Sequence, residues 1–136
     1  MPDELTLEVV TPAKVLLETK ADYVTIPGVL GEMGILPGHI PLLSDLKSGV
    51  LSYTSGSEQK KYAVHYGYAE IHKNKITILA NEAESSDEID PASAKEAQAK
   101  MQAELDQAVK DSADQVVINQ LQQAIFKEIT RQEVVS

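Results

Sequence analysis

The chain has 136 residues, no cysteine and a formal net charge of −9, from 21 acidic and 12 basic residues. A chain of this length can bury about two-thirds of its unfolded surface, which is enough for one modest core. The missing cysteines exclude disulfides, thiolate zinc sites, iron–sulfur clusters and a cysteine nucleophile. The acidic excess argues against nucleic acid as a partner, because phosphate binding needs a concentrated basic patch.

The start of the chain is acidic and leads directly into an alternating pattern, so it predicts no signal peptide or transit segment. No apolar run reaches the roughly 18 residues needed for a membrane-spanning helix. The residues therefore predict a soluble chain, which leaves docking on a membrane complex open.

Glycine and proline divide the chain into two parts. All seven glycines lie between Gly28 and Gly67, and the last proline is Pro91. Residues 5–10 alternate with the period of a half-buried strand, and similar short runs cover residues 14–18, 23–26, 50–53, 60–65, 68–72 and 75–80. Short strands with turn signals and no intervening helix predict an antiparallel β-sandwich or barrel over residues 1–86.

The remaining residues, 87–136, are expected to be helical. Residues 81–88 are polar and predict a connection, after which Asp90 offers an N-cap and Pro91 a first helical residue. The first helix is expected at about 91–110 and the second at about 114–132, with a capping box of Ser112 and Gln115. The two predict an antiparallel hairpin. The residues expected to pack it are Ala94, Ala97, Met101, Leu105, Ile118, Leu121 and Ile125.

Residues 27–43 form the most unusual segment. Its glycines Gly28, Gly31 and Gly34 recur every three residues, which matches neither a dinucleotide fingerprint nor a Walker loop. Tight turns between short strands would explain the glycines. The segment also carries many apolar side chains, and an exposed apolar loop indicates a protein partner. These apolar residues are Val29, Leu30, Met33, Ile35, Leu36 and Ile40.

The histidines offer little chemistry. His65 and His72 lie seven residues apart without a third ligand in register, so a metal site is not predicted. His39 lies between Gly38 and Ile40 and fits a turn or an interface better than a proton relay. No known catalytic motif occurs, and the sequence predicts a protein that is not an enzyme and needs no cofactor.

The run P-G-x-x-G-E-x-G-x-x-P-G-H-x-P-L-L-S-x-L-K-x-G at residues 27–49 resembles the signature of the epsilon subunit of bacterial F-type ATP synthases. The runs at residues 62–64, 67–71 and 77–80, and Ile89 with Asp90, extend the resemblance over nearly the whole chain. It implies an α+β fold, in which a flattened antiparallel sandwich of about ten strands is followed by a two-helix hairpin.

The resemblance also implies a non-catalytic rotor subunit of the central stalk, which couples rotation of the c-ring to the gamma subunit and the catalytic head. The alpha and beta subunits would be transient partners, and the isolated chain a monomer. The implied location is the cytoplasmic face of the bacterial plasma membrane, as a peripheral protein. The c-ring side would comprise Gly31, Glu32, Met33 and Gly34, and the gamma side His39, Pro41, Leu43 and Ser44.

The alternative implied by the family is an ATP-responsive switch, in which bound nucleotide holds the hairpin folded. Some members do this through an Ile-Asp-x-x-Arg-Ala motif. Here Ile89 and Asp90 are present, but Ser93 replaces the arginine and cannot make a comparable phosphate contact, which leaves Arg131 as a candidate. The second helix has only Lys127 and Arg131 as cations, so we expect weak or absent inhibition of ATP hydrolysis. A third hypothesis is an adaptor unrelated to rotary enzymes.

Overall fold

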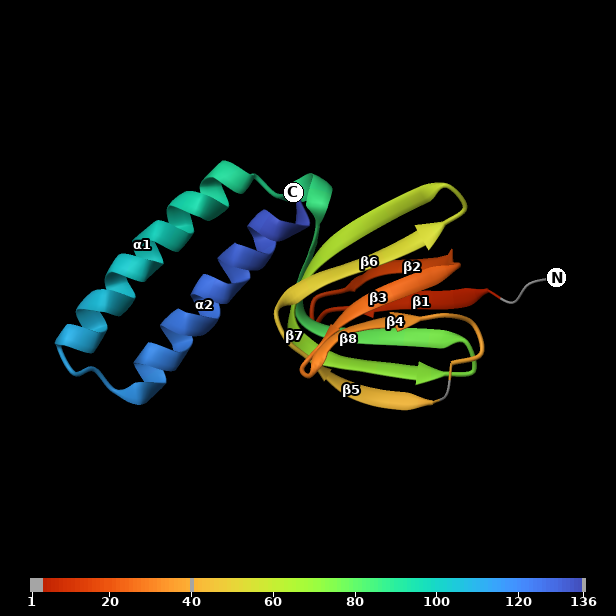
Figure 1. Ribbon diagram of the computed structural model, residues 1–136, viewed down its shortest axis with the longest axis horizontal. Coiled ribbons are helices and arrows are strands. Elements are labelled where there is room, and N and C mark those ends of the chain that lie inside the picture. Colours follow the sequence, from red (N-terminus) through yellow and green to blue (C-terminus); the bar gives the residue numbers. More distant parts are fainter. Residues whose placement is uncertain (1–3, 40, 136) are drawn as a thin grey trace.

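The computed structural model describes residues 4–39 and 41–135 (Figure 1). A β-sandwich forms the first part, and a hairpin of two helices extends from one end of it. The strands are β1 (Leu5–Val10), β2 (Val15–Ala21), β3 (Tyr23–Gly28), β4 (Gly31–Ile35), β5 (Leu42–Leu46), β6 (Gly49–Ser55), β7 (Glu58–His72) and β8 (Lys75–Ser85). A short 3-10 helix, η1 (Ser86–Glu88), precedes α1 (Pro91–Lys110) and α2 (Gln115–Val134).

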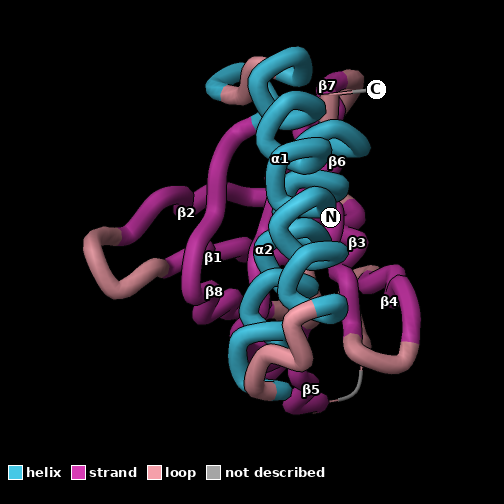
Figure 2. The backbone as a smooth tube through the Cα atoms, turned by 90° about the vertical axis from the view of Figure 1, so that its left-hand side faces the viewer, coloured by secondary structure: helices cyan, strands magenta, loops and turns pink. Residues whose placement is uncertain are grey.

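Two layers make the sandwich, with β2, β1 and β8 on one side and β6, β3 and β4 on the other (Figure 2). β7 contributes to both layers. Its first half pairs with β6, from Glu58 to Val64, and its second half pairs with β5, from Gly67 to Ile71. Tyr66 and Gly67, with φ of 61° and 132°, lie between the two halves. The long strand therefore bends from one layer into the other.

This bend accounts for part of the difference between the expected and the observed number of strands. The expectation was about ten strands, with separate strands at residues 60–65 and 68–72, whereas the described residues contain eight. β7 stays hydrogen-bonded to β8 on both sides of Tyr66, so the two expected strands are one. One pair also departs from the antiparallel pattern, since β1 runs parallel to β8. The two strands are far apart in sequence, so no tight hairpin constrains their direction.

The core follows the alternation read from the sequence. In β1 the side chains of Leu5, Leu7 and Val9 are fully buried, while those between them are half-buried. A fully buried aliphatic side chain of this kind contributes about 1.5–3 kcal/mol. The core is completed from the other strands, chiefly by Val24, Ile26, Ile35, Leu51, Val64, Ile71, Ile76 and Ile78.

The expected polar connection at residues 81–88 is wrong in its first part. Residues 81–85 extend β8, and Ala83 pairs with Val64 while Ser85 pairs with Tyr62. The backbone groups of this segment are satisfied by the ladder whatever the side chains are, so polar residues on its outer side are compatible with a strand. Only residues 86–88 form a turn of 3-10 helix, capped by the hydroxyl of Ser85.

Side-chain caps begin both helices. Asp90 accepts a hydrogen bond of 3.0 Å from the backbone N of Ala92, and Pro91 is the first helical residue, as expected. The second cap was expected to be a box of Ser112 and Gln115, which is wrong. Asp114 caps α2 instead, by accepting a bond of 2.9 Å from the backbone N of Val116. Ser112 has a φ of 52° and belongs to the turn between the helices.

The helices lie side by side and antiparallel (Figures 1 and 2), and α2 packs on β6 and β7. Of the residues expected to pack the hairpin, Ala94 and Ile125 are buried, whereas Ala97, Met101, Leu105, Ile118 and Leu121 are half-buried. Near its free end the hairpin exposes apolar side chains, among them Val109 and Val116. Among the residues described, neither helix is apolar enough over its length to cross a bilayer.

Candidate functional site

The turn between β3 and β4 exposes two apolar side chains. Gly28 pairs with Gly31, which leaves Val29 and Leu30 at the tip. Gly31 has a φ of 136°, a conformation that favours glycine. Val29 is 54% exposed and Leu30 is completely exposed. The backbone N of Val29 donates to the carbonyl of Asp45 over 3.1 Å, so the turn is tied to the end of β5 while its apolar tip faces solvent.

The loop between β4 and β5 lies beyond the opposite end of β4. Leu36 in this loop is 59% exposed. The backbone N of Gly38 donates over 2.7 Å to Oδ1 of Asn74, in the turn between β7 and β8. A backbone bond from His39 to Leu36 closes a turn. Five residues of β4 therefore separate this loop from the exposed turn at Leu30.

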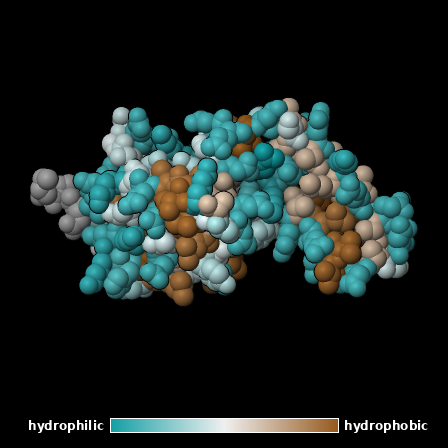
Figure 3. Space-filling view, turned by 180° about the vertical axis from the view of Figure 1, so that it is seen from behind, coloured by the Kyte–Doolittle hydropathy of each residue, from teal (hydrophilic) through white to brown (hydrophobic). Residues whose placement is uncertain are grey.

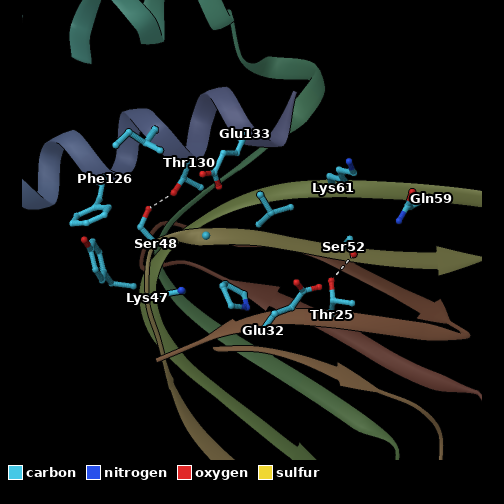
Figure 4. Close-up of a pocket in the computed structure, with 15 residues that line it drawn as sticks. Thr25, Glu32, Lys47, Ser48, Ser52, Gln59, Lys61, Phe126, Thr130 and Glu133 are labelled. Atoms are coloured by element: carbon cyan, nitrogen blue, oxygen red, sulfur yellow. Dashed lines mark hydrogen bonds between the residues drawn. The ribbon is translucent and has the colours of Figure 1, made fainter. Parts of the chain in front are cut away.

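The four residues expected on the c-ring side form strand β4 rather than a loop. Met33 points inward and packs against the core, whereas Glu32 and Gly34 are exposed on the outer face. Glu32 and Lys47 both line a cavity below α2 (Figure 4). The sequence indicated the exposed tip through the two apolar residues between Gly28 and Gly31. It did not indicate that Glu32 lies in a strand, because that depends on pairing with β3.

The residues expected on the gamma side are spread over a loop and a strand. His39 is half-buried in the loop, and Pro41 is exposed. On β5, Leu43 is 71% exposed on the outer face. Ser44, the next residue of the strand, points to the opposite face and is half-buried. Leu43 and Ser44 therefore cannot both contact a partner that covers a single face of the sheet. Ile40 lies outside the described residues.

An apolar stripe crosses the outer face of the layer that contains β1, β2 and β8. Tyr68 lies opposite Leu79, Leu79 opposite Val10, and Val10 opposite Val15 in successive strand pairs. Tyr68, Leu79 and Val15 are at least half exposed. Leu43 extends the stripe, because it is two residues from Asp45, the partner of Tyr68. Figure 3 shows apolar surface on this side of the sandwich and a second area on the hairpin.

The hairpin meets the sandwich at a seam that is partly apolar. Ala63 on β7 is fully buried there, with Ile89 before α1 and Val134 at the end of α2. Val50 and Val135 pack at its margin. The small size of this cluster means that polar contacts also hold the hairpin in place.

The polar part of the seam contains two ion pairs between α2 and β8. Lys127 Nζ lies 2.9 Å from Oε1 of Glu82, and Arg131 Nε lies 3.1 Å from Oε1 of Glu84. The contact between Arg131 and Glu84 is an ion pair and not a hydrogen bond, because the N–H at Nε does not point at a carboxylate oxygen. Arg131 also donates from Nη1 to Glu128 on its own helix, over 3.1 Å. These partly exposed pairs contribute about 0–1 kcal/mol each.

A hydroxyl pair and a buried imidazole complete the seam. Ser48 Oγ lies 2.8 Å from Thr130 Oγ1 on α2, as Figure 4 shows, and 3.0 Å from Nδ1 of His65. His65 is 1% exposed, and burial lowers its pKa below the ordinary value of 6.5. His72 is exposed at the far end of β7, so the two histidines do not share a site. Sequence reasoning missed the seam, because its groups come from four segments that are distant in the sequence.

A cavity of about 780 Å³ opens between α2 and the outer face of β3 and β6 (Figure 4). Phe126, Thr130 and Glu133 line it from the helix, and Thr25 and Ser52, joined by a hydroxyl hydrogen bond, line it from the sheet. Its charged residues, Glu32, Glu133, Lys47 and Lys61, are of both signs. Nothing in this lining selects a ligand of one charge.

The residues expected for nucleotide binding are occupied by other contacts. Ile89 is buried in the seam. Asp90 accepts from the hydroxyl of Ser93 over 3.0 Å and from the backbone of Ala92, and these bonds lower its pKa. Arg131 is paired with Glu84 and Glu128. In the described part of the chain no three acidic or histidine side chains are placed to hold a metal ion.

The fold is thus a β-sandwich with a helical hairpin packed against one end, and apolar side chains are exposed on both parts. The chain belongs to the ATP synthase delta/epsilon family, because the family described as "ATP synthase, Delta/Epsilon chain, beta-sandwich domain" matches residues 4–86. It is therefore a non-catalytic subunit of ATP synthase, within the F1 sector and peripheral to the membrane.

Curated relatives agree with this assignment. The chain is 43% identical over 105 residues to ATP synthase epsilon chain 2 of Syntrophotalea carbinolica, covering 77% of this chain and 76% of the relative. It is 47% identical over 90 residues to the epsilon chain of Carboxydothermus hydrogenoformans, covering 66% and 67%. With the epsilon chain of Lawsonia intracellularis it shares 40% identity over 111 residues, covering 82% and 84%.

Two solved structures share the fold. A chain in the Euglena gracilis mitochondrial ATP synthase, solved as OSCP/F1/c-ring, superposes with a TM-score of 0.84 at 23% identity, covering all of this chain and 84% of that one. A chain of the Tetrahymena thermophila mitochondrial ATP synthase central stalk and c-ring gives a TM-score of 0.55 at 19% identity, covering 64% and 70%. At such identities the likeness concerns the fold alone.

Proposed function

We propose that the sandwich couples the c-ring to the gamma subunit, with the ring at the turn between β3 and β4 and gamma on the apolar stripe. The complete exposure of Leu30, on a turn that is hydrogen-bonded to β5, is the observation that carries the ring contact. Burying a leucine side chain contributes about 1.5–3 kcal/mol, more than an exposed ion pair of Glu32 can provide. In this proposal Gly31 and Gly34 shape the ring-binding segment, and Met33 anchors it to the core.

For the gamma side, support comes from the stripe of Val10, Val15, Leu43, Tyr68 and Leu79. It crosses neighbouring strands on a face that the hairpin leaves open, since Val15, Leu43, Tyr68 and Leu79 are each at least half exposed. Apolar side chains that form one continuous exposed surface are typical of a protein interface. His39 and Pro41 would contact gamma at the end of this face, with Ser44 supporting β5 from within.

The same proposal places the chain at the cytoplasmic face of a bacterial plasma membrane, reached through the ring. The relatives reported above belong to bacteria, which supports this location. The hairpin would contact the alpha and beta subunits only when it leaves the seam, and the chain separated from the complex would be a monomer.

Co-purification of gamma and the c-ring with the tagged chain tests the proposal. Leu30→Ser should reduce recovery of the ring about tenfold and leave gamma, since the lost burial is at least about 1.4 kcal/mol. Leu43→Ser combined with Leu79→Ser should reduce recovery of gamma. Val109→Ser is the matched control, because Val109 is 57% exposed on α1, away from both surfaces. Unchanged recovery for both test variants would refute the two assigned surfaces.

A further inference from the structure

His65 is buried by the hairpin rather than by the sandwich core. Val64, the preceding residue of β7, belongs to the core, so His65 points to the opposite face of the strand, towards α2. Its side chain is 1% exposed, in contact with groups that reach Thr130 and Arg131 of α2. Lifting α2 from the seam would therefore return the imidazole to water.

The neutral ring completes a chain of hydrogen bonds between the two parts. One ring nitrogen, Nε2, can donate to Glu84 Oε1 over 3.4 Å, while the other, Nδ1, accepts from the Ser48 hydroxyl over 3.0 Å. Ser48 Oγ can then accept from Thr130 Oγ1 over 2.8 Å. Each group in this chain has a partner of the right kind when the imidazole is neutral. Thr130 is 3% exposed, so its hydroxyl depends on this partner.

The protonated ring is poorly compensated at the same place. Protonated Nδ1 can no longer accept from Ser48, and the new charge is buried. Glu84 Oε1 is the nearest negative charge, but Arg131 Nε lies closer to that oxygen, at 3.1 Å. Arg131 is also paired with Glu128. The carboxylates of Glu84 and Glu128 are therefore already paired with Arg131, which is permanently charged.

The other charged groups that face the ring come from β8 and α2. Glu82 on β8 is paired with Lys127 on α2. The positive charge of Lys127 opposes protonation of the His65 ring. Burial is the largest influence on the pKa of His65 and lowers it, and the smaller upward effects of Glu84 and Glu82 do not reverse the direction.

We propose that protonation of His65 releases the hairpin from the sandwich, so that acidification moves the chain from a docked to an undocked state. The docked state binds fewer protons than the undocked state, in which the exposed ring has its ordinary pKa of 6.5. Docking is therefore favoured fully above that value, and it weakens as the pH falls through 6.5 towards the lower pKa of the docked ring. The proposal concerns the chain itself and is independent of the surfaces assigned to the ring and gamma.

The test measures the position of the hairpin in the full-length chain. Because the sequence has no cysteine, Ser57→Cys and Ala103→Cys give two unique labelling sites, both exposed, one on the sandwich and one on α1. The distance between two labels there reports docking. Between about pH 7.5 and 5.5 the docked-to-undocked ratio should fall several-fold, while carboxylates of ordinary pKa stay ionised.

Two variants locate the response. His65→Gln supplies one donor and one acceptor but no titrating group, so its hairpin should stay docked over the whole range. His72→Gln is the matched control and should respond as the parent chain does, because His72 is exposed at the far end of β7. A constant label distance in the parent chain, or an unchanged response in His65→Gln, would overturn the proposal.

If His65→Gln does not dock at neutral pH, NMR titration of the parent chain decides the question. The ring of His65 should titrate below 6.5 while the labels report docking. A pKa at or above 6.5 in the docked state would show that protonation does not oppose docking, and the proposal would be wrong.

Discussion

The hydroxyl groups of Ser48 and Thr130 lie 2.8 Å apart, although 82 residues separate them in the sequence. Ser48 precedes β6 and Thr130 lies on α2, so this bond crosses from the sandwich to the hairpin. The apolar cluster of the seam is small. The hydrogen bond adds a contact that forms only when the two hydroxyl groups have the right orientation. The position of the hairpin thus depends on a few buried polar groups.

Thr130→Val tests this dependence. Valine keeps the shape of threonine but leaves Ser48 without its partner on α2, so docking of the hairpin should weaken by about 1–2 kcal/mol. Hydrogen exchange of the amides in the last turns of α2 measures the change. Ser57→Ala, at an exposed turn, should leave this exchange unchanged. Equal protection of α2 in the parent chain and Thr130→Val would contradict the prediction.

Gly67→Ala should destabilise the sandwich by about 3 kcal/mol or more. The φ of Gly67 is 132°, and a Cβ there would clash with the backbone carbonyl oxygen of Leu79. The clash is with backbone, so it cannot be relieved without opening the β7–β8 ladder. Urea unfolding measures the loss.

Gly56→Ala provides the comparison for this variant. Gly56 also has a positive φ, of 63°, but a Cβ there would meet open space. The expected cost is only about 1–2 kcal/mol, from backbone strain alone. If the two variants had equal free energies of unfolding, the close approach of Gly67 to Leu79 would not be a determinant of stability.

Removal of the hairpin after Ser86 should leave the rate of ATP hydrolysis by the complex unchanged. The two cations of α2, Lys127 and Arg131, are paired with Glu82 and Glu84, and the helix also carries Glu128 and Glu133. Little positive charge is left to bind an acidic surface on a catalytic subunit. The measurement compares hydrolysis by complexes with the full-length and the truncated chain in equal amounts. A several-fold rise on truncation would reveal an inhibitory hairpin.

Calorimetric titration with ATP and magnesium should give no binding heat at millimolar nucleotide. Ser93 cannot replace the motif arginine, and its hydroxyl donates to Asp90. Arg131 would have to leave Glu84 and Glu128 before it could meet a phosphate. Saturable heat in the parent chain would restore the alternative of an ATP-responsive switch.

Local sequence was sufficient where neighbouring residues decide the structure. The alternation of Leu5, Leu7 and Val9 predicted a strand with one buried face, and Asp90 followed by Pro91 predicted the start of α1. The exposed apolar residues at Leu30 and Leu36 were also expected from a segment with more apolar side chains than turns can bury. In each of these the signal lies within a few residues.

The errors arose where distant segments decide. Residues 81–85 are polar, yet they pair with β7. The bend at Tyr66 joins two expected strands into one only because β8 bends with it. His65 offered no sequence signal of its role, because its partners are Ser48 and Glu84.

The sequence by itself determined the division into a sandwich and a hairpin, the inward face of its strands and the family, since periodicity, breakers and a contiguous motif are local properties. Tertiary structure alone decided the parallel pairing of β1 with β8, the apolar stripe and the polar seam beneath α2. These depend on which backbones lie side by side, and hydrogen bonds and burial between distant segments exist only after the chain has closed its loops.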